Sequence, residues 1–169
     1  MISGCLENLP MAEAVKRGNA IGAIVITSKG DNENLPTRDE LKKFNTRDGM
    51  GFALLRNKGV ITGIVTSENV DLNRRRAEKL KLDVLEAGCK DKVAAVRALC
   101  EKYNISLENV AYIGDDINDL DVIKMVGYGC CPSDAMPQVK EAAKYVTNAK
   151  GGEGVIREIV DIIVKGDGK

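Results

Sequence analysis

Histidine is missing from all 169 residues of the sequence. Its absence excludes the Ser-His and Cys-His pairs of nucleophilic enzymes, and it excludes every metal site that needs an imidazole ligand. A metal bound by this chain would therefore be a hard cation held by oxygen atoms, and Mg²⁺ is the usual cation of that kind.

Net charge is missing as well, because 25 basic residues balance 25 acidic ones. A protein that binds nucleic acid needs a basic face, so the composition argues against such a partner. No apolar run approaches the roughly 20 residues of a membrane-spanning helix, and no signal peptide is visible. We therefore expect neither a nucleic-acid partner nor a membrane partner.

Cysteine pairs with metal-binding or redox spacing are also absent. The five cysteines form an odd set without a C-x-x-C pattern, which indicates reduced thiols in a cytoplasmic protein. Cys130 and Cys131 lie in an apolar run, and they are predicted to be buried as small hydrophobic residues.

Short apolar runs rich in β-branched residues alternate with amphipathic segments of helical period. Six runs are predicted strands: Ile21–Ile26, Val60–Val65, Val84–Leu85, Val110–Ile113, Gly127–Cys131 and Tyr145–Thr147. The alternation predicts an α/β fold with a doubly wound, mainly parallel sheet and helices on both faces. Residues 20–169 suit a single domain, and residues 1–19 form an N-terminal extension or linker.

Polar residues stand where four of the predicted strands end. They are Thr27 after the first strand, Thr66 and Ser67 after the second, Lys92 after the third, and Asp115 and Asp116 after the fourth. Ligands of doubly wound sheets bind outside the carboxyl ends of the strands, so these groups are expected to form one site.

The acidic group after the fourth strand is predicted to be half of a site for Mg²⁺ and phosphate. Asp115, Asp116 and Asp119 are close in sequence, and carboxylates held together resist ionisation unless a cation joins them. An acidic helix start would explain one of the three carboxylates, but not all of them. The other half should be carboxylates after the first strand, where the sequence instead has Thr27 and Lys29.

These segments resemble the haloacid dehalogenase superfamily, and within it the capless subfamily of 3-deoxy-octulosonate 8-phosphate phosphatases. Similar domains act on nine-carbon sialic-type sugar phosphates or form the C-terminal domain of CMP-sialic acid synthetases. Four segments carry the resemblance: Lys43–Gly49, Asn73–Leu80, Val110–Asp119 and Gly151–Glu158. The resemblance covers residues 21–164, and it implies a fold without a large cap domain, Mg²⁺ as the cofactor and an acidic sugar phosphate as the substrate.

The resemblance also implies roles for the residues at the strand ends. Thr66, the amide of Ser67 and Lys92 would hold the transferring phosphoryl group, and Asp115 with Asp116 beside it would hold the metal. A hydroxyl, an amide and an ammonium match the charge on phosphoryl oxygens. The alternatives are a Thr66 hydroxyl that caps the next helix and a Lys92 side chain that lies in solvent.

The first motif departs from the family pattern Asp-x-Asp-Gly, in which one carboxylate attacks phosphorus and the other is the general acid and base. When Gly30 is aligned with the glycine of the motif, Thr27 stands at the nucleophile position and Lys29 at the acid/base position. Threonine needs an adjacent base to attack, and a lysine ammonium accepts no proton near neutrality. Loss of the proton transfer alone removes about 10²–10⁴-fold of rate.

Asp31 and Glu33 are the nearest replacements for the missing carboxylates. A slip of two residues moves a group by roughly 6–7 Å along an extended chain, too far for in-line attack, and residues 30–34 fit a solvent-facing turn better. A second hypothesis concerns Lys29, whose ammonium would occupy the vacated cation position and pair with Asp115 or Asp116. The alternative is a Lys29 side chain in solvent.

Six further residues are candidates for the mouth of the site or for a subunit contact: Asp48, Arg74, Gly151, Gly152, Gly154 and Arg157. By resemblance, the glycine loop reaches a neighbouring subunit in a homotetramer. The alternatives are a flexible strand-to-helix turn for the loop, a solvated helix face for Arg74 and a cap of the following helix for Asp48.

The leading interpretation is a pseudoenzyme, a phosphatase-like domain that has lost efficient hydrolysis and has an assembly or regulatory role linked to nucleotide-sugar synthesis. The alternative is an active or weak Mg²⁺-dependent phosphatase for an eight- or nine-carbon keto-sugar phosphate, with a rewired site. A receiver-like phosphorylation switch is a third hypothesis. It fits poorly, because receivers carry paired acids on the first strand and lysine on the last.

Overall fold

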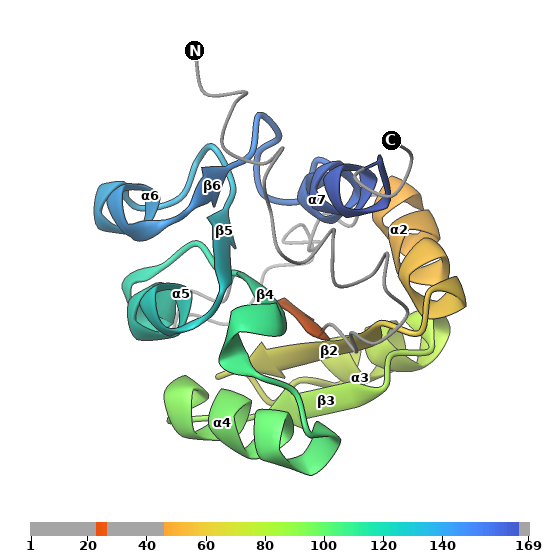
Figure 1. Cartoon of the computed structure of the whole chain (residues 1–169). Coiled ribbons are helices and arrows are strands. Elements are labelled where there is room, and N and C mark those ends of the chain that lie inside the picture. Colours follow the sequence, from red (N-terminus) through yellow and green to blue (C-terminus); the bar gives the residue numbers. More distant parts are fainter. Residues whose placement is uncertain (1–22, 27–45, 166–169) are drawn as a thin grey trace.

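The strands lie where the apolar runs predict them, within two residues at each end. The computed structural model describes residues 23–26 and 46–165. The strands in Figure 1 are β1 (Ala23–Ile26), β2 (Ile61–Thr66), β3 (Val84–Ala87), β4 (Val110–Ile113), β5 (Tyr128–Cys131) and β6 (Tyr145–Val146). The proposed extension of residues 1–19 lies outside the described residues.

The six strands form one parallel sheet with the order β3-β2-β1-β4-β5-β6. The chain adds strands on one side of β1 up to β3 and then crosses back to place β4 on the other side. Ile26, the last residue of β1, lies opposite Ile64 of β2 and Ile113 of β4. The doubly wound prediction is confirmed, and β1 and β4 form the point where the strand order reverses.

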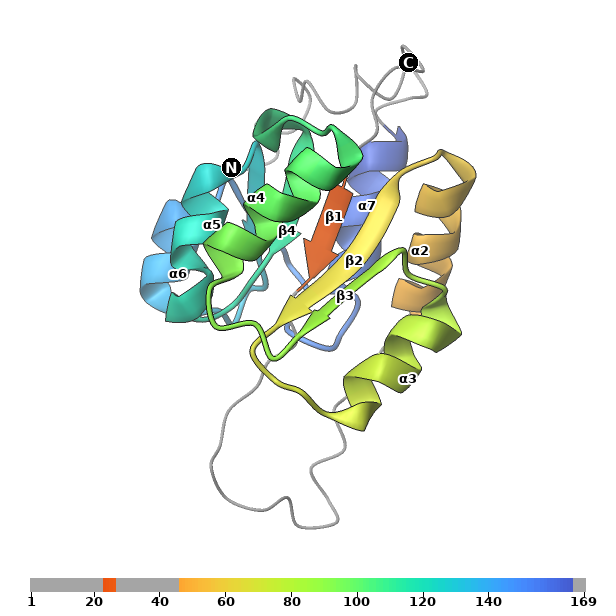
Figure 2. The ribbon, with the colours of Figure 1, turned by 90° about the horizontal axis from the view of Figure 1, so that it is seen from below.

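Helices cover both faces of the sheet, as predicted. They are α2 (Thr46–Asn57), α3 (Asp71–Leu80), α4 (Lys92–Tyr103), α5 (Leu120–Met125), α6 (Pro137–Ala142) and α7 (Val155–Lys165), with 3-10 turns at Leu107–Asn109 and Ile117–Asp119. Figure 2 shows α4, α5 and α6 on one side of the strands and α2, α3 and α7 on the other. Right-handed crossovers between parallel strands place helices in this way.

Two apolar layers hold the sheet between its helices. Val96 and Cys100 of α4 pack with Tyr112 in the first layer, while Leu55 of α2 packs with Ile159 of α7 in the second. Helices α4 and α7 bury residues at steps of four, Val96 and Cys100 in α4 and Val155, Ile159 and Ile163 in α7, because these positions share one face.

The two adjacent cysteines of β5 face different layers. Cys131 belongs to the layer of α4 and α5, and Cys130 belongs to the layer of α2 and α7, because successive side chains of a strand alternate between faces. Burial raises the pKa of Cys130 to about 12 and the pKa of Cys131 to about 11. The predicted burial is confirmed, and both groups stay protonated thiols.

Every described helix and strand belongs to the sheet or to the layers that cover it. Within residues 23–26 and 46–165 there is thus no separate cap domain, in agreement with the sequence. No helix in the same part of the chain combines the length and the apolar character needed to cross a membrane.

Candidate active site

The carboxyl ends of β2, β1 and β4 lie side by side at one edge of the sheet. Thr66 ends β2, and Gly114 and Asp115 follow β4, on either side of β1. Thr27 and Lys29 follow β1 in the sequence and lie outside the described residues. Thr66 and Asp115 therefore lie at the reversal point of the sheet, where ligands of such folds bind.

The hydroxyl of Thr66 is buried at the end of β2, with 1% of the residue exposed. Its oxygen accepts a hydrogen bond from the backbone N–H of Glu68 at 3.2 Å. Helix α3 begins further on, after Val70, without a side-chain cap. The alternative in which Thr66 caps α3 is therefore wrong, and its hydroxyl instead supports the loop of exposed Ser67.

Lys92 is the first residue of α4, and only 7% of it is exposed. Asp91 accepts a hydrogen bond from the backbone N–H of Ala94 at 2.9 Å and so caps the start of α4. The Nζ atom of Lys92 donates to Asp119 Oδ1 at 2.7 Å and to Asn118 Oδ1 at 3.2 Å. The alternative of a solvated lysine is wrong, because the ammonium is held under the loop that follows β4.

The loop that follows β3 is joined directly to the end of β2. The backbone N–H of Cys89 donates to the carbonyl of Thr66 at 2.9 Å, and Lys92 follows three residues later. The Thr66 hydroxyl and the Lys92 ammonium, two groups suited to phosphoryl oxygens, thus lie on either side of a direct hydrogen bond between the end of β2 and the loop that leads into α4.

The three carboxylates after β4 have different tasks. Asp116 accepts from the backbone of Ile117 at 2.6 Å and forms a capping box with Asp119. Asp119 is buried and paired with Lys92. The helix-start interpretation therefore holds for Asp116 and Asp119, and half-buried Asp115 is left as the principal candidate for a metal ligand.

A Mg²⁺ ion needs several oxygen ligands in a near-octahedral arrangement. Among the residues that the structure describes, no three His, Cys, Asp or Glu side chains come together to hold a metal. Asp115 and Asp116 are the half-buried carboxylates of the loop that follows β4. Alone, this donor set does not fit a tightly bound Mg²⁺.

Asp48 lies inside one helix and accepts a hydrogen bond from the start of another. It is the third residue of α2, 5% exposed, and its Oδ1 atom accepts from the backbone N–H of Arg157 at 3.0 Å. Arg157 is the third residue of α7, so Asp48 caps α7 from another helix. Gly154, the residue before α7, has no side chain with which to cap that helix, and Asp48 takes this role.

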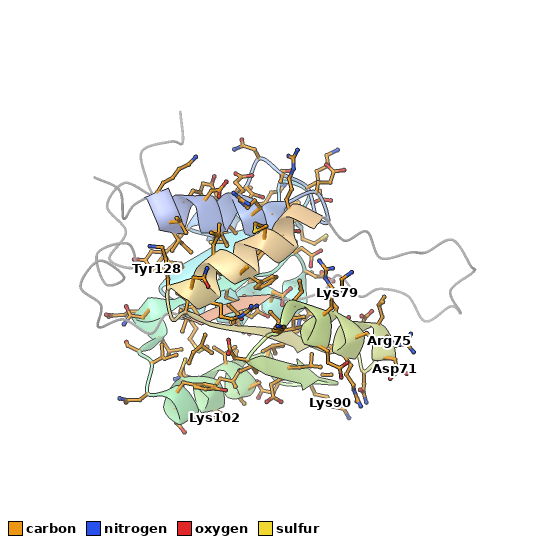
Figure 3. All side chains as sticks on the ribbon, turned by 90° about the vertical axis from the view of Figure 1, so that its right-hand side faces the viewer. Asp71, Arg75, Lys79, Lys90, Lys102 and Tyr128 are labelled. Carbon is orange, nitrogen blue, oxygen red and sulfur yellow. The ribbon has the colours of Figure 1, made fainter. Side chains whose placement is uncertain are left out.

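Burial raises the pKa of Asp48, and the bond from Arg157 and the charge of Arg76 lower it by less. Arg76 is half-buried beside this carboxylate, while Arg74 is exposed on α3. Figure 3 labels Asp71, Arg75 and Lys79, three exposed charged residues of α3. The solvated-face alternative fits Arg74, whereas Arg76 contributes to the surroundings of Asp48.

The glycine loop between β6 and α7 lies beside the loop that follows β5. Gly151 donates its N–H to Asp134 Oδ1 at 2.8 Å, and Ser133 donates its N–H to the carbonyl of Ala149 at 3.0 Å. Gly152 and Gly154 have φ values of 76° and 105°, a region that favours glycine. The loop is therefore a built turn at the same edge of the sheet as Asp115.

Two residues of the site are missing from the sequence-based set. Asn118 accepts from Lys92, and the hydroxyl of Tyr112 donates to Asp119 Oδ1 at 2.7 Å. The available signal for Tyr112 is a tyrosine within an aliphatic strand, because buried tyrosine hydroxyls usually have a partner. Asn118 carries no signal beyond its place between two acidic residues.

Comparison with known proteins places this geometry in a family. The sequence profile described as haloacid dehalogenase-like hydrolase matches residues 28–159. The chain belongs to this family.

Relatives within the haloacid dehalogenase-like hydrolases are sugar-phosphate phosphatases. The chain is 37% identical over 131 residues to the 3-deoxy-D-manno-octulosonate 8-phosphate phosphatase KdsC of Escherichia coli K12, covering 78% of the chain and 70% of the relative. It is 39% identical to the Yersinia pestis enzyme of the same name over 126 residues, covering 75% and 67%. The resemblance seen in the sequence is confirmed.

Two solved structures of such phosphatases contain metal ions. The Moraxella catarrhalis enzyme, crystallised with magnesium, phosphate and a KDO molecule, superposes with a TM-score of 0.82 at 28% identity, covering 95% of this chain and 94% of that one. The cobalt-bound Haemophilus influenzae enzyme superposes with a TM-score of 0.80 at 27% identity, covering 91% and 92%. Divalent metal use is therefore a property of this haloacid dehalogenase-like group.

Proposed function

We propose that this chain binds the phosphoryl group of an acidic keto-sugar phosphate of eight or nine carbons and hydrolyses it slowly or not at all. The contrast between the two halves of the site carries the proposal. Thr66 and Lys92 are buried at the strand ends, whereas Thr27 and Lys29 replace the carboxylates expected after β1.

Phosphoryl binding is supported by the charges at the strand ends. Lys92 directs its ammonium under the loop after β4, where Asp119 neutralises it within the fold. Three N–H groups are available on an ammonium, so contacts to Asp119 and Asn118 leave a donor for a phosphoryl oxygen. The named substrate of the relatives is 3-deoxy-D-manno-octulosonate 8-phosphate, and it is the first substrate to test.

Slow turnover follows from the chemistry of the first motif. A threonine hydroxyl attacks phosphorus only when a base removes its proton, and Lys29 is a cation near neutrality. The described residues at this edge offer Asp115 and Asp116, which follow another strand. We infer that neither the covalent step nor the proton transfer of the family proceeds efficiently.

Mg²⁺ binding is proposed to be weak for a related reason. The carboxylate expected after β1 is replaced by Thr27, and the ammonium of Lys29 supplies positive charge near Asp115 or Asp116 in place of the metal. Calorimetric titration with Mg²⁺ should therefore give weaker binding to the native chain than to Lys29→Asp. Equal affinities would contradict the idea that Lys29 replaces the cation.

The deciding experiment measures Mg²⁺-dependent phosphate release from 3-deoxy-D-manno-octulosonate 8-phosphate. The native chain should release phosphate at the background rate. Thr27→Asp/Lys29→Asp should exceed it by at least about 10²-fold, because proton transfer alone is usually worth about 10²–10⁴-fold. Each single variant should remain close to background, since the two carboxylates act as a unit.

Two controls make this comparison specific. Asp115→Asn in the double variant should return the rate to background, which excludes a contaminating phosphatase. Lys92→Gln in the native chain should weaken inorganic phosphate binding without unfolding the protein. If the native chain turned over substrate within about tenfold of the rate of the double variant, the proposal that it has lost efficient hydrolysis would be wrong.

Such native turnover would establish the second candidate function, an active phosphatase with a rewired first motif. The observation that favours it is the 37% identity to the Escherichia coli enzyme over most of the chain. The two functions share the phosphoryl site, so phosphate binding does not separate them. The rate of the native chain does.

We also propose that the chain forms a homotetramer with an assembly or regulatory role and that it is linked to a nucleotide-sugar synthetase. The glycine loop after β6 supports this proposal, because it is built at the edge of the site and Gly151 and Lys150 are exposed. Co-purification with a CMP-sialic acid synthetase activity would support the link. A chain that neither self-associates nor retains such an activity would contradict it.

A further inference from the structure

A buried polar network lies beneath the loop that follows β4. Its members are Tyr112, Asp119 and Lys92, of which 0%, 1% and 7% are exposed. Buried polar groups are costly unless they are paired, so a network of this kind constrains the positions of its members.

Asp119 joins the two halves of the network through its two oxygen atoms. Oδ1 accepts from Lys92 Nζ and from the Tyr112 hydroxyl, both at 2.7 Å. Oδ2 accepts from the backbone N–H groups of Asp115 and Asp116, at 3.2 and 3.3 Å. One carboxylate thus holds both the ammonium of the phosphoryl site and the backbone that presents the acidic residues.

Gly114 makes this arrangement possible. A Cβ atom at Gly114 would lie 2.4 Å from the Cβ atom of Asp119, so any larger residue would displace the carboxylate. Tyr112, two residues earlier on β4, is packed in the layer of Val96 and Val122. Its ring is fixed by this packing, and its hydroxyl therefore meets the carboxylate at a fixed point.

We propose that Tyr112 is a positioning residue for the phosphoryl site. Its hydroxyl holds the Asp119 carboxylate in the orientation that serves Lys92 through one oxygen and the Asp115–Asp116 backbone through the other. Without the hydroxyl, Asp119 would rotate toward the ammonium, and both Lys92 and the acidic loop would move. The proposal rests on the proposed phosphoryl binding and adds the residue that fixes its geometry.

Tyr112→Phe tests the proposal, because it removes one oxygen atom and keeps the packed ring. Tyr103→Phe is the matched control, since Tyr103 packs against the same apolar layer and its ring faces Lys102. The readouts are the dissociation constant of inorganic phosphate by calorimetry, the thermal midpoint, and the ¹⁵N–¹H resonances of Asp115 and Asp116.

Tyr112→Phe should weaken phosphate binding by about tenfold, in keeping with the loss of a hydrogen bond to a charged group. It should also shift the Asp115 and Asp116 amide resonances in the phosphate-free protein. Tyr103→Phe should change neither quantity. If Tyr112→Phe lowers the thermal midpoint but changes neither phosphate binding nor the Asp115 and Asp116 resonances, Tyr112 has a purely structural role. That result would overturn the proposal.

The amide resonances separate this proposal from the proposed function. Unmoved Asp115 and Asp116 resonances in Tyr112→Phe overturn the positioning role, whether or not phosphate binds. Failure of the native chain to bind millimolar phosphate overturns phosphoryl binding instead. Asp119→Asn, which keeps the shape and removes the charge, should weaken phosphate binding more than Tyr112→Phe, and the reverse order would contradict the central place of Asp119.

Discussion

Two buried carboxylates, Asp48 and Asp119, are satisfied in different ways. Asp119 has an ammonium, a hydroxyl and two backbone N–H groups around it. Asp48 accepts one backbone N–H at a helix start and has the charge of Arg76 nearby. The cost of burying a charge is offset more fully at Asp119, which fits a place in the site for Asp119 and a cap for Asp48.

Replacement of Asp48 should separate its capping role from its charge. Asp48→Ala removes the cap of α7 and should lower the free energy of unfolding by about 0.5–2 kcal/mol. Asp48→Asn keeps an acceptor for Arg157 and should cost less. Urea unfolding at pH 7 measures both, and Asp121→Ala, an exposed acidic residue in the first turn of α5, is the control.

The pH dependence of the Asp48 contribution has a definite sign. Burial raises its pKa above the value in the unfolded chain, so its contribution to stability is largest below the unfolded pKa and decreases as the pH rises through the folded pKa. Asp48→Asn should lack this component. Equal destabilisation by Asp48→Asn and Asp48→Ala would contradict the capping role.

At the scale of elements, one side chain joins α7 to the segment after β6. Glu158 Oε1 accepts from the Tyr145 hydroxyl at 2.7 Å and from the Asn148 backbone at 2.9 Å, and Oε2 accepts from the Ala149 backbone at 3.0 Å. Burial alone would raise the pKa of Glu158, but the hydrogen bonds from Asn148, Tyr145 and Ala149 together hold it below its ordinary value. The segment that leads into the glycine loop is therefore fixed to α7 by the hydrogen bonds of Glu158.

Protonation of Glu158 at low pH should weaken its hydrogen bonds to the segment after β6. Ionised Glu158 stabilises the fold above its unfolded pKa of about 4.5, and this contribution is lost as the pH falls through the lower folded pKa. Glu158→Gln should lower the free energy of unfolding at pH 7 by about 1–2 kcal/mol, because hydrogen bonds to a partly exposed charge are replaced by weaker ones.

The measurement is urea unfolding from pH 7 to pH 3, where the native chain should lose its advantage over Glu158→Gln below about pH 4.5. Glu141→Gln on α6, an exposed residue, is the control. A difference between native and Glu158→Gln that stays constant to pH 3 would exclude ionisation of Glu158 as the cause.

At the scale of the whole molecule, the mass in solution tests the tetramer. The native chain should sediment at about four times its 18.2 kDa. Truncation after Lys150 is a poor test, because α7 buries Val155, Ile159, Val160 and Ile163 in the core. Lys150→Glu reverses one exposed charge of the glycine loop, and it should lower the mass if the loop meets a neighbouring subunit.

Lys124→Glu makes the same charge change at an exposed position of α5 and should leave the mass unchanged. A native chain that sediments as a monomer would contradict the tetramer. An unchanged mass for Lys150→Glu within a tetramer would instead place the contact away from this loop.

Local patterns in the sequence determined the elements, the order of the functional groups and the family. Short apolar runs and helical runs of period three to four depend on residues near each other in the chain, and the strands lie where the apolar runs predict them. The expectation that Thr66, Lys92 and Asp115 share one edge also followed from local patterns, because parallel strands place their carboxyl ends together. The single domain of residues 20–169 remains a prediction.

Only the tertiary structure decided which partner each polar group has. Asp48 meets the backbone of Arg157 across 109 positions of sequence, and Lys92 meets Asp119 across 27. No local pattern encodes such pairs, since they arise from the packing of α2 against α7 and of α4 beneath the loop after β4. For the same reason the sequence grouped three carboxylates and implied Asp115 and Asp116 as metal ligands, whereas packing made Asp116 a cap and Asp119 the partner of Lys92. Asp115 is left as the candidate metal ligand.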